Sequence, residues 1–121
     1  MVLHHDRVDV EGLRIEVRRV AERLRSMSVE RLCRGFPPYA SRAAAALALA
    51  QRLADAAEEL EAEAQGRQPV RRAVPDLGPL VVGDQVAVTG EDLAAAAEVL
   101  ADPDERVTGC LAALGELRRA L

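Results

Sequence analysis

The stretch Arg34-Gly35-Phe36-Pro37-Pro38 divides the first half of the chain, because a glycine followed by two prolines cannot continue a helix. Before this break, apolar residues recur at alternating steps of four and three residues: Leu13, Val17, Val20, Leu24 and Met27. The same spacing returns after it, at Tyr39, Ala43, Ala46, Ala50, Leu53, Ala57, Leu60 and Ala64. Because such spacing places each set on one stripe of a helix, residues 9–65 are predicted to form a helical hairpin with an apolar seam.

The ends of these two helices can be estimated from capping residues. The first is expected to begin after Asp9, a suitable N-cap, and to run to about residue 32 or 33. The second is expected to run from near Pro38 to Gln65, with Gly66 as its C-cap. It should be buried on more than one side at residues 43–50, which are apolar all round. Its acidic second half should project into water or meet a basic partner.

Residues 66–79 form a linker that is longer than most connections in a compact bundle. The linker contains three prolines and three arginines, and we expect it to cross over the end of the bundle. The basic triplet Arg67, Arg71 and Arg72 could contact an acidic partner or a phosphate. A solvated loop paired with the acidic end of the preceding helix is the favoured interpretation.

The C-terminal part, residues 80–121, is expected to form a helical pair. Leu80 to Gly90 fits a strand or the start of a helix, and the helix is favoured because a lone strand has no partner. It would begin near Gly83 or Asp84 and carry one apolar stripe: Val82, Val86, Leu93, Ala97 and Leu100. The last helix is expected to have Asp102 as its N-cap. Its apolar face would be Val107, Cys110, Leu111, Leu114, Leu117 and Leu121.

These elements predict an all-α fold, a small antiparallel bundle of about four helices, in one domain over residues 1–121. Half of the residues are hydrophobic, but many are alanines, and the only aromatic residues are Phe36 and Tyr39. All 16 basic residues are arginines, which is typical of a GC-rich bacterial genome and is therefore poor evidence for phosphate binding. The net charge of −4 argues against a nucleic-acid or anionic-membrane partner. The chain shows no signal peptide or membrane span, so a cytoplasmic location is expected.

No arrangement of residues predicts a catalytic, cofactor-binding or metal site. His4, His5 and Asp6 form the only histidine cluster, and a metal site needs three or four preorganised ligands, so we interpret them as part of a solvated lead. Cys33 and Cys110 could pair across the bundle, but two reduced thiols, at least one of them buried, are favoured.

The sequence therefore predicts a non-enzymatic interaction or assembly module that buries an Ala/Leu surface against a second copy or another protein. The expected interface residues lie around the break and on the all-apolar stretch: Phe36, Tyr39, Ala43, Leu47 and Leu49. The alternative is a DNA-binding regulator with a helix-turn-helix in its C-terminal half. The acidic character of that half does not favour this alternative, because a recognition helix exposes Arg, Asn, Gln or Ser to the bases.

The predicted hairpin also resembles the small helical-hairpin substrates of type VII secretion, which turn at a Trp-x-Gly motif. Cys33-Arg34-Gly35 occupies a comparable place without the tryptophan. The Tyr-x-x-x-Asp/Glu export signal of that family is not matched either, since Tyr39 is followed by Ala43 at the fourth position. The resemblance covers the hairpin only and would imply a secreted helical protein.

Overall fold

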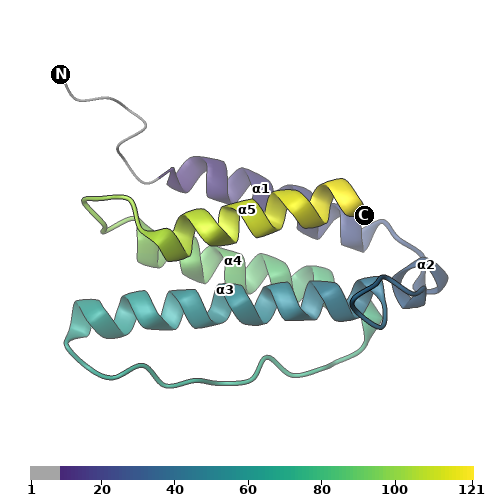
Figure 1. Cartoon of the computed structure of the whole chain (residues 1–121), viewed down its shortest axis with the longest axis horizontal. Coiled ribbons are helices and arrows are strands. Elements are labelled where there is room, and N and C mark those ends of the chain that lie inside the picture. Colours follow the sequence, from purple (N-terminus) through teal and green to yellow (C-terminus); the bar gives the residue numbers. More distant parts are fainter. Residues whose placement is uncertain (1–8) are drawn as a thin grey trace.

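Four long helices and one short helix make up residues 9–121, the part of the chain that the computed structural model describes (Figure 1). They are α1 (Val10–Arg25), α2 (Val29–Cys33), α3 (Arg42–Gln65), α4 (Val82–Ala97) and α5 (Glu105–Ala120), with a 3₁₀ turn, η2 (Pro79–Val81), directly before α4. The predicted all-α small bundle is confirmed. The cluster of His4, His5 and Asp6 lies outside the described residues.

The long helices stand at the corners of a square in which α1 and α5 run one way and α3 and α4 run the other (Figure 1). α4 packs extensively against both α1 and α3, and α5 contacts the same two helices from the other side. α1 and α3 therefore occupy a diagonal. This corrects the predicted seam between the first two helices: they are antiparallel, but their apolar stripes face α4 and α5 rather than each other.

The linker explains this topology, because it runs back along the whole of α3 and does not simply cross the end of the bundle as expected (Figure 1). The side-chain amide of Gln51 donates to the carbonyl oxygen of Arg72 over 2.9 Å, and its Oε1 accepts from the backbone N–H of Val74 over 2.7 Å. Gln85 donates to the carbonyl oxygen of Pro75 over 2.7 Å. The linker thus returns the chain to the start of α3, so α4 begins there and runs parallel to α3.

α1 and α4 approach each other closely at two glycines of α4, Gly83 and Gly90, which lie about two helical turns apart. A Cβ atom on Gly90 would lie 2.5 Å and 2.6 Å from the two γ-carbons of Val17. A Cβ atom on Gly83 would lie 3.1 Å from the carbonyl oxygen of Ala21 and 2.9 Å from Cγ of Arg25. Glycine in a helix interior is destabilising by itself, and here it lets the α1 side chains reach the α4 backbone.

Several helix ends differ from the prediction because nearby serine and aspartate residues cap the helices. The first helix stops at Arg25, and Ser28 then caps α2 by accepting from the N–H of Arg31 over 3.2 Å. Ser41 caps α3 by accepting from Ala44 over 3.0 Å, so α3 begins after residue 41 instead of near Pro38. Its C-cap is Gly66, as predicted, with a left-handed φ of 66°.

The two C-terminal helices form where the sequence pattern predicts them, but they do not pack as the expected pair, because α4 and α5 lie on the other diagonal of the bundle. Leu100, predicted on the stripe of the first of these helices, lies beyond its end at Ala97. The segment from Leu80 to Gly90 is helical, as favoured, and α4 begins at Val82. The N-cap of α5 is Asp104 rather than the predicted Asp102, because the Asp104 carboxylate accepts from the N–H of Arg106 over 2.8 Å.

The core consists of leucine, valine and alanine side chains from all four long helices. The stripe predicted for the first helix is buried throughout, from Leu13 to Met27. The stripe on α3 is buried only in its middle, since Tyr39 and Ala64 at its two ends are exposed. Among residues 9–121, no helix combines the length and the hydropathy that crossing a bilayer requires.

The close contact at Gly90 predicts that Gly90→Ala destabilises the protein despite the higher helix propensity of alanine. The added methyl group would overlap Val17 and should cost about 1–3 kcal/mol, against a gain of about 1 kcal/mol from propensity. Gly109→Ala is the matched control, because its Cβ would meet only the flexible end of Arg52 and should leave stability unchanged or raise it. Urea unfolding of both variants checks this, and a more stable Gly90→Ala variant would contradict it.

Truncation of the core should have a larger effect. Leu53 is fully buried in α3, so we expect Leu53→Ala to leave a cavity and lower the free energy of unfolding by about 2–5 kcal/mol. Glu61→Ala, an exposed position on the same helix, should change it by less than about 0.5 kcal/mol. Thermal melts of the two variants compare them, and equal melting temperatures would show that the orientation of α3 is wrong.

Candidate interaction surface

The five residues predicted to form an interface lie on two sides of α3. Phe36, Tyr39 and Leu49 line a surface hollow between α3 and α5. Ala43 and Leu47 line a second hollow between α3 and the linker. The structure therefore brings three of the five together and places the other two elsewhere.

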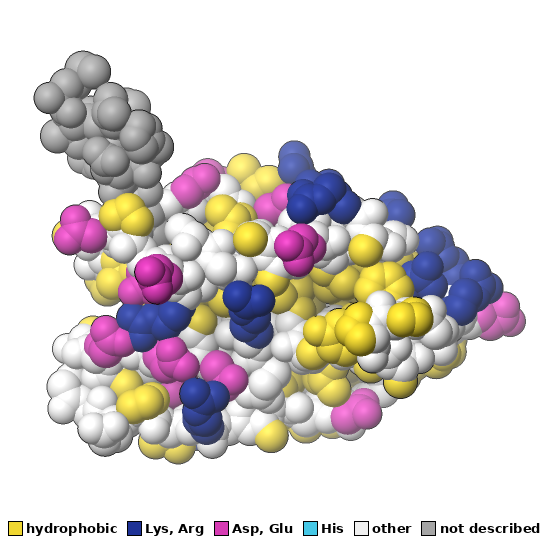
Figure 2. All heavy atoms as spheres, in the orientation of Figure 1, with side chains coloured by type: hydrophobic (Ala, Val, Ile, Leu, Met, Phe, Trp, Pro, Cys, Tyr) yellow, Lys and Arg dark blue, Asp and Glu magenta, His cyan; other side chains and the backbone are white. Residues whose placement is uncertain are grey.

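The first hollow, called here the aromatic hollow, has a volume of about 260 Å³ and lies where the N-terminal part of α3 passes the C-terminal part of α5. Its lining is mostly apolar and consists of Phe36, Tyr39, Ala45, Ala48, Leu49, Arg52, Ala113, Glu116, Leu117 and Ala120. Figure 2 shows hydrophobic side chains gathered on this face, between the two helices. Because both helices present small alanines here, their side chains do not fill the space between them.

The two aromatic residues are held at the rim of this hollow by the loop that precedes α3. The backbone N–H of Tyr39 donates to the carbonyl oxygen of Phe36 over 2.8 Å, which closes a turn through Pro37 and Pro38. The guanidinium of Arg42 lies over the Phe36 ring, 5.4 Å from its centroid, a cation–π contact. Phe36 packs partly against the core, whereas the Tyr39 side chain is 44% exposed.

Leu49 contributes less surface than predicted because the core of the bundle covers it. It is only 6% exposed, so the expectation that it needs a partner for burial is wrong. The exposed small residues of the hollow, Ala48 and Ala120, were not among the predicted positions. Ala48 lies on the all-apolar stretch of α3, and its exposure depends on how α5 and the linker flank that stretch.

The second hollow, of about 440 Å³, lies beneath the end of the linker. Leu47 and Ala43 are half-buried there, beside Val74, Pro79 and the exposed Cys33. The linker already covers part of this face of α3. The aromatic hollow differs from this one in its lining, which includes both aromatic residues of the chain, with Tyr39 exposed.

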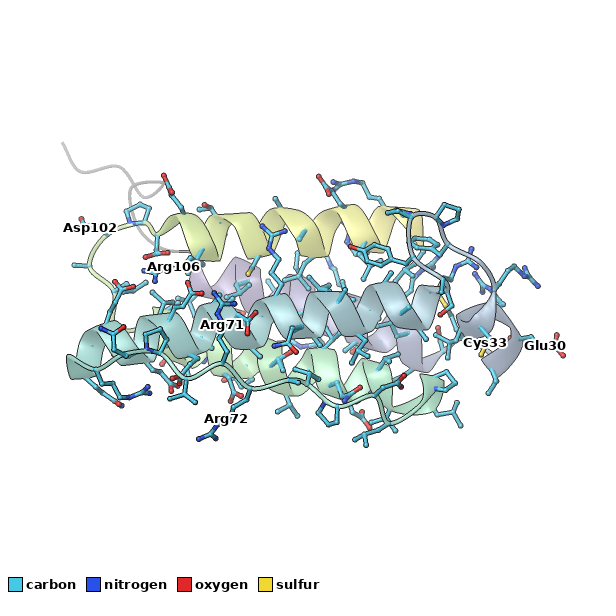
Figure 3. All side chains as sticks on the ribbon, turned by 60° about the horizontal axis from the view of Figure 1, so that its bottom comes forward. Glu30, Cys33, Arg71, Arg72, Asp102 and Arg106 are labelled. Carbon is cyan, nitrogen blue, oxygen red and sulfur yellow. The ribbon has the colours of Figure 1, made fainter. Side chains whose placement is uncertain are left out.

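The acidic half of α3 meets basic side chains of the same chain. Arg67 contacts Glu58 over 2.5 Å, and Arg71 lies 3.4 Å from Asp55 and 3.6 Å from Glu59. The interpretation that the basic triplet pairs with this helix is therefore confirmed for Arg67 and Arg71. Figure 3 shows Arg71 over α3, while Arg72 points away from the helices.

Arg106 of α5 extends this network across the bundle, which the sequence analysis did not anticipate (Figure 3). Its guanidinium contacts Glu63, lies 3.7 Å from Glu59 and lies 2.8 Å from Asp104. Glu59 lies between Arg71, 3.6 Å away, and Arg106. The linker, α3 and α5 are joined by one set of ion pairs at this end of the molecule.

These contacts lower the pKa values of two carboxylates of α3, Glu58 and Glu63. The hydrogen bond from Arg67, helped by the backbone N–H of Val70 at 2.7 Å, lowers the pKa of Glu58 to about 2. The hydrogen bond from Arg106 lowers the pKa of Glu63. Both carboxylates therefore stay ionised to lower pH than an ordinary glutamate, and each is paired with an arginine of the same chain.

A different set of arginines forms no ion pair within residues 9–121. It includes Arg18, Arg19 and Arg23 of α1 and Arg31 and Arg34 of α2 and its following bend. All five side chains are exposed. Figure 2 shows dark-blue side chains at the end of the molecule where α2 lies, next to the hydrophobic face. The molecule therefore has a basic end, and the aromatic hollow opens beside it.

The two cysteines are both free and lie apart in the fold. Cys33 is exposed at the α2 end, and Cys110 is buried inside α5, where burial raises the pKa of its thiol and keeps it neutral. The favoured interpretation, two unpaired thiols with one buried, agrees with this. No group of three or more metal-ligating side chains comes together within residues 9–121.

Comparison with protein families, with curated proteins and with solved structures finds no match to this chain.

The Arg67–Glu58 contact predicts a measurable titration. Because the pKa of Glu58 is depressed in the folded protein, its stabilising contribution is present above the ordinary carboxylate range and is lost as the pH falls toward about 2. In Arg67→Ala the Glu58 midpoint should rise, while Arg118→Ala, on the far side of the bundle, should leave it unchanged. Carboxyl-carbon NMR titration measures both, and an unmoved midpoint in Arg67→Ala would show that the ion pair does not form in solution.

Proposed function

We propose that this protein is a non-enzymatic interaction module that binds a segment of a partner protein in the aromatic hollow. The observation that carries the proposal is the exposed Tyr39 ring beside Phe36, both held at the rim of an apolar hollow. They are the only two aromatic residues of the chain. Tyrosine is one of the residue types enriched among the few that dominate binding energy at protein interfaces.

The loop geometry supports this proposal. A backbone hydrogen bond from Tyr39 to Phe36 orders the turn, and a cation–π contact from Arg42 orders the Phe36 ring, before any partner arrives. A preordered surface loses less conformational entropy on binding than a mobile one. Additional apolar surface is available from Ala48 and Ala120, which are exposed in the same hollow.

The DNA-binding alternative has less support. α4 and α5 lie on a diagonal of the bundle, and α5 turns its apolar face inward toward the core. Its exposed side carries Glu116 and Arg119 among small residues, which gives no continuous basic face for a phosphate backbone. The basic end of the molecule belongs to α1 and α2 instead.

The test is site-specific photo-crosslinking in cells of the source organism. A photo-reactive phenylalanine analogue at Tyr39 should give a discrete protein adduct, and the same analogue at Thr108, exposed at the far end of α5, should not. Ala48→Glu places a charge in the hollow at an exposed position and should abolish the Tyr39 adduct. Ala64→Glu, exposed on the same helix outside the hollow, should leave the adduct intact.

Tyr39→Ala should weaken binding of the crosslinked partner by about 2 kcal/mol, the size expected for an interface hot spot. Isothermal titration with that partner measures the change. The proposal is wrong if no discrete adduct forms at Tyr39, or if Ala48→Glu and Ala64→Glu affect the adduct equally.

A further inference from the structure

We infer that the occupant of the aromatic hollow is an acidic amphipathic helix of another protein. This inference rests on the proposed function and adds the chemistry of the partner. It follows from three features of the described chain: the charge beside the hollow, the shape of the hollow and the internal use of the chain's own acidic surface.

The charge beside the hollow is positive. Arg31 and Arg34 lie five and two residues before Phe36 in the chain, and both side chains are exposed without an ion pair in the part of the chain that the structure describes. Arg42 links the backbone of both residues to the loop that carries Phe36 and Tyr39. Its side chain donates to the carbonyl oxygen of Arg31 over 3.4 Å, and its backbone N–H donates to the carbonyl oxygen of Arg34 over 3.3 Å.

Arg52, another exposed arginine without an ion pair among residues 9–121, lines the hollow itself, where Glu116 is the only acidic residue. A partner with carboxylates around its apolar face would neutralise these charges. A partner with lysines or arginines there would be repelled.

The shape fits a helix. The hollow lies along the groove between α3 and α5, which run antiparallel, and its floor is built from small side chains such as Ala45, Ala48 and Ala113. A helix that presents apolar residues at three- and four-residue spacing can lie in such a groove with its polar side outward. The Tyr39 ring then contacts one end of that apolar stripe.

A second copy of this chain is a poorer fit, although it too would bury apolar surface. Its most acidic helical segment is the second half of α3, and Glu58, Glu59 and Glu63 are already paired with arginines of the same chain. Using these carboxylates between copies would require breaking the contacts that hold the linker and α5. A separate protein can supply an acidic helix without breaking these contacts.

The test uses two synthetic helical peptides that share one leucine face, the first with glutamates and the second with lysines on the polar face. Fluorescence anisotropy should show that the intact protein binds the glutamate peptide at least tenfold more tightly. The double variant Arg31→Glu/Arg34→Glu should lose about tenfold of that affinity and gain affinity for the lysine peptide. The matched double variant Arg18→Glu/Arg19→Glu, on α1, should change neither value more than about twofold.

Several outcomes would overturn the inference: equal binding of both peptides, tighter binding of the lysine peptide, no binding of either, or equal effects of the two double variants. Sedimentation that shows a dimer dissolved by Ala48→Glu would identify a second copy as the occupant and would also overturn it. These results leave the proposed function standing if Tyr39 still crosslinks to a discrete protein. Loss of that crosslink, by contrast, would refute the proposed function itself.

Discussion

The rest of the structure depends on the close approach of α1 and α4, which Gly83 and Gly90 permit. Because a side chain at either position would meet α1, the two glycines set the distance between these helices. α4 can then lie between α1 and α3, so that these two helices do not pack directly on each other. α5 fills the opposite corner, and its small residues Ala113 and Ala120 face the alanines of α3 across the aromatic hollow. The position of the proposed binding surface is thus a consequence of how α4 packs.

Much of the fold could be predicted from the sequence, because local rules decide where helices form and which face is apolar. The stripe of α1, the apolar face of α5 and the stop at Gly66 follow from periodicity and capping alone. Periodicity does not say which helix a stripe faces. A linker long enough to return along α3 permits more than one arrangement, so the predicted seam between the first two helices was the natural but incorrect choice. Gly90, in the middle of α4, was the residue of the sequence that indicated a close approach by another helix.

The candidate surface could be predicted in part. Phe36 and Tyr39 stand at a helix break and lie together at the rim of the hollow, as their position suggested. Leu49 lines the same hollow but is buried, so it offers little surface to a partner. Composition alone could not show which arginines form ion pairs within the chain and which do not. Arg67, Arg71 and Arg106 pair with the acidic helix, and Arg14 and Arg25 of α1 pair with α4 or the residue after it. The other arginines of α1 and those of α2 and its following bend form no ion pair within residues 9–121.

The central claim, that α4 packs directly on α1, can be tested without any mutation by nuclear Overhauser spectroscopy on the methyl-labelled protein. We expect strong cross-peaks between the Val17 methyl groups and the α-protons of Gly90, since these groups are in contact in the structure. If the Val17 methyl groups instead showed their strongest contacts with alanines of α3 and none with Gly90, the first two helices would form a direct hairpin, and the arrangement described for the bundle would be wrong.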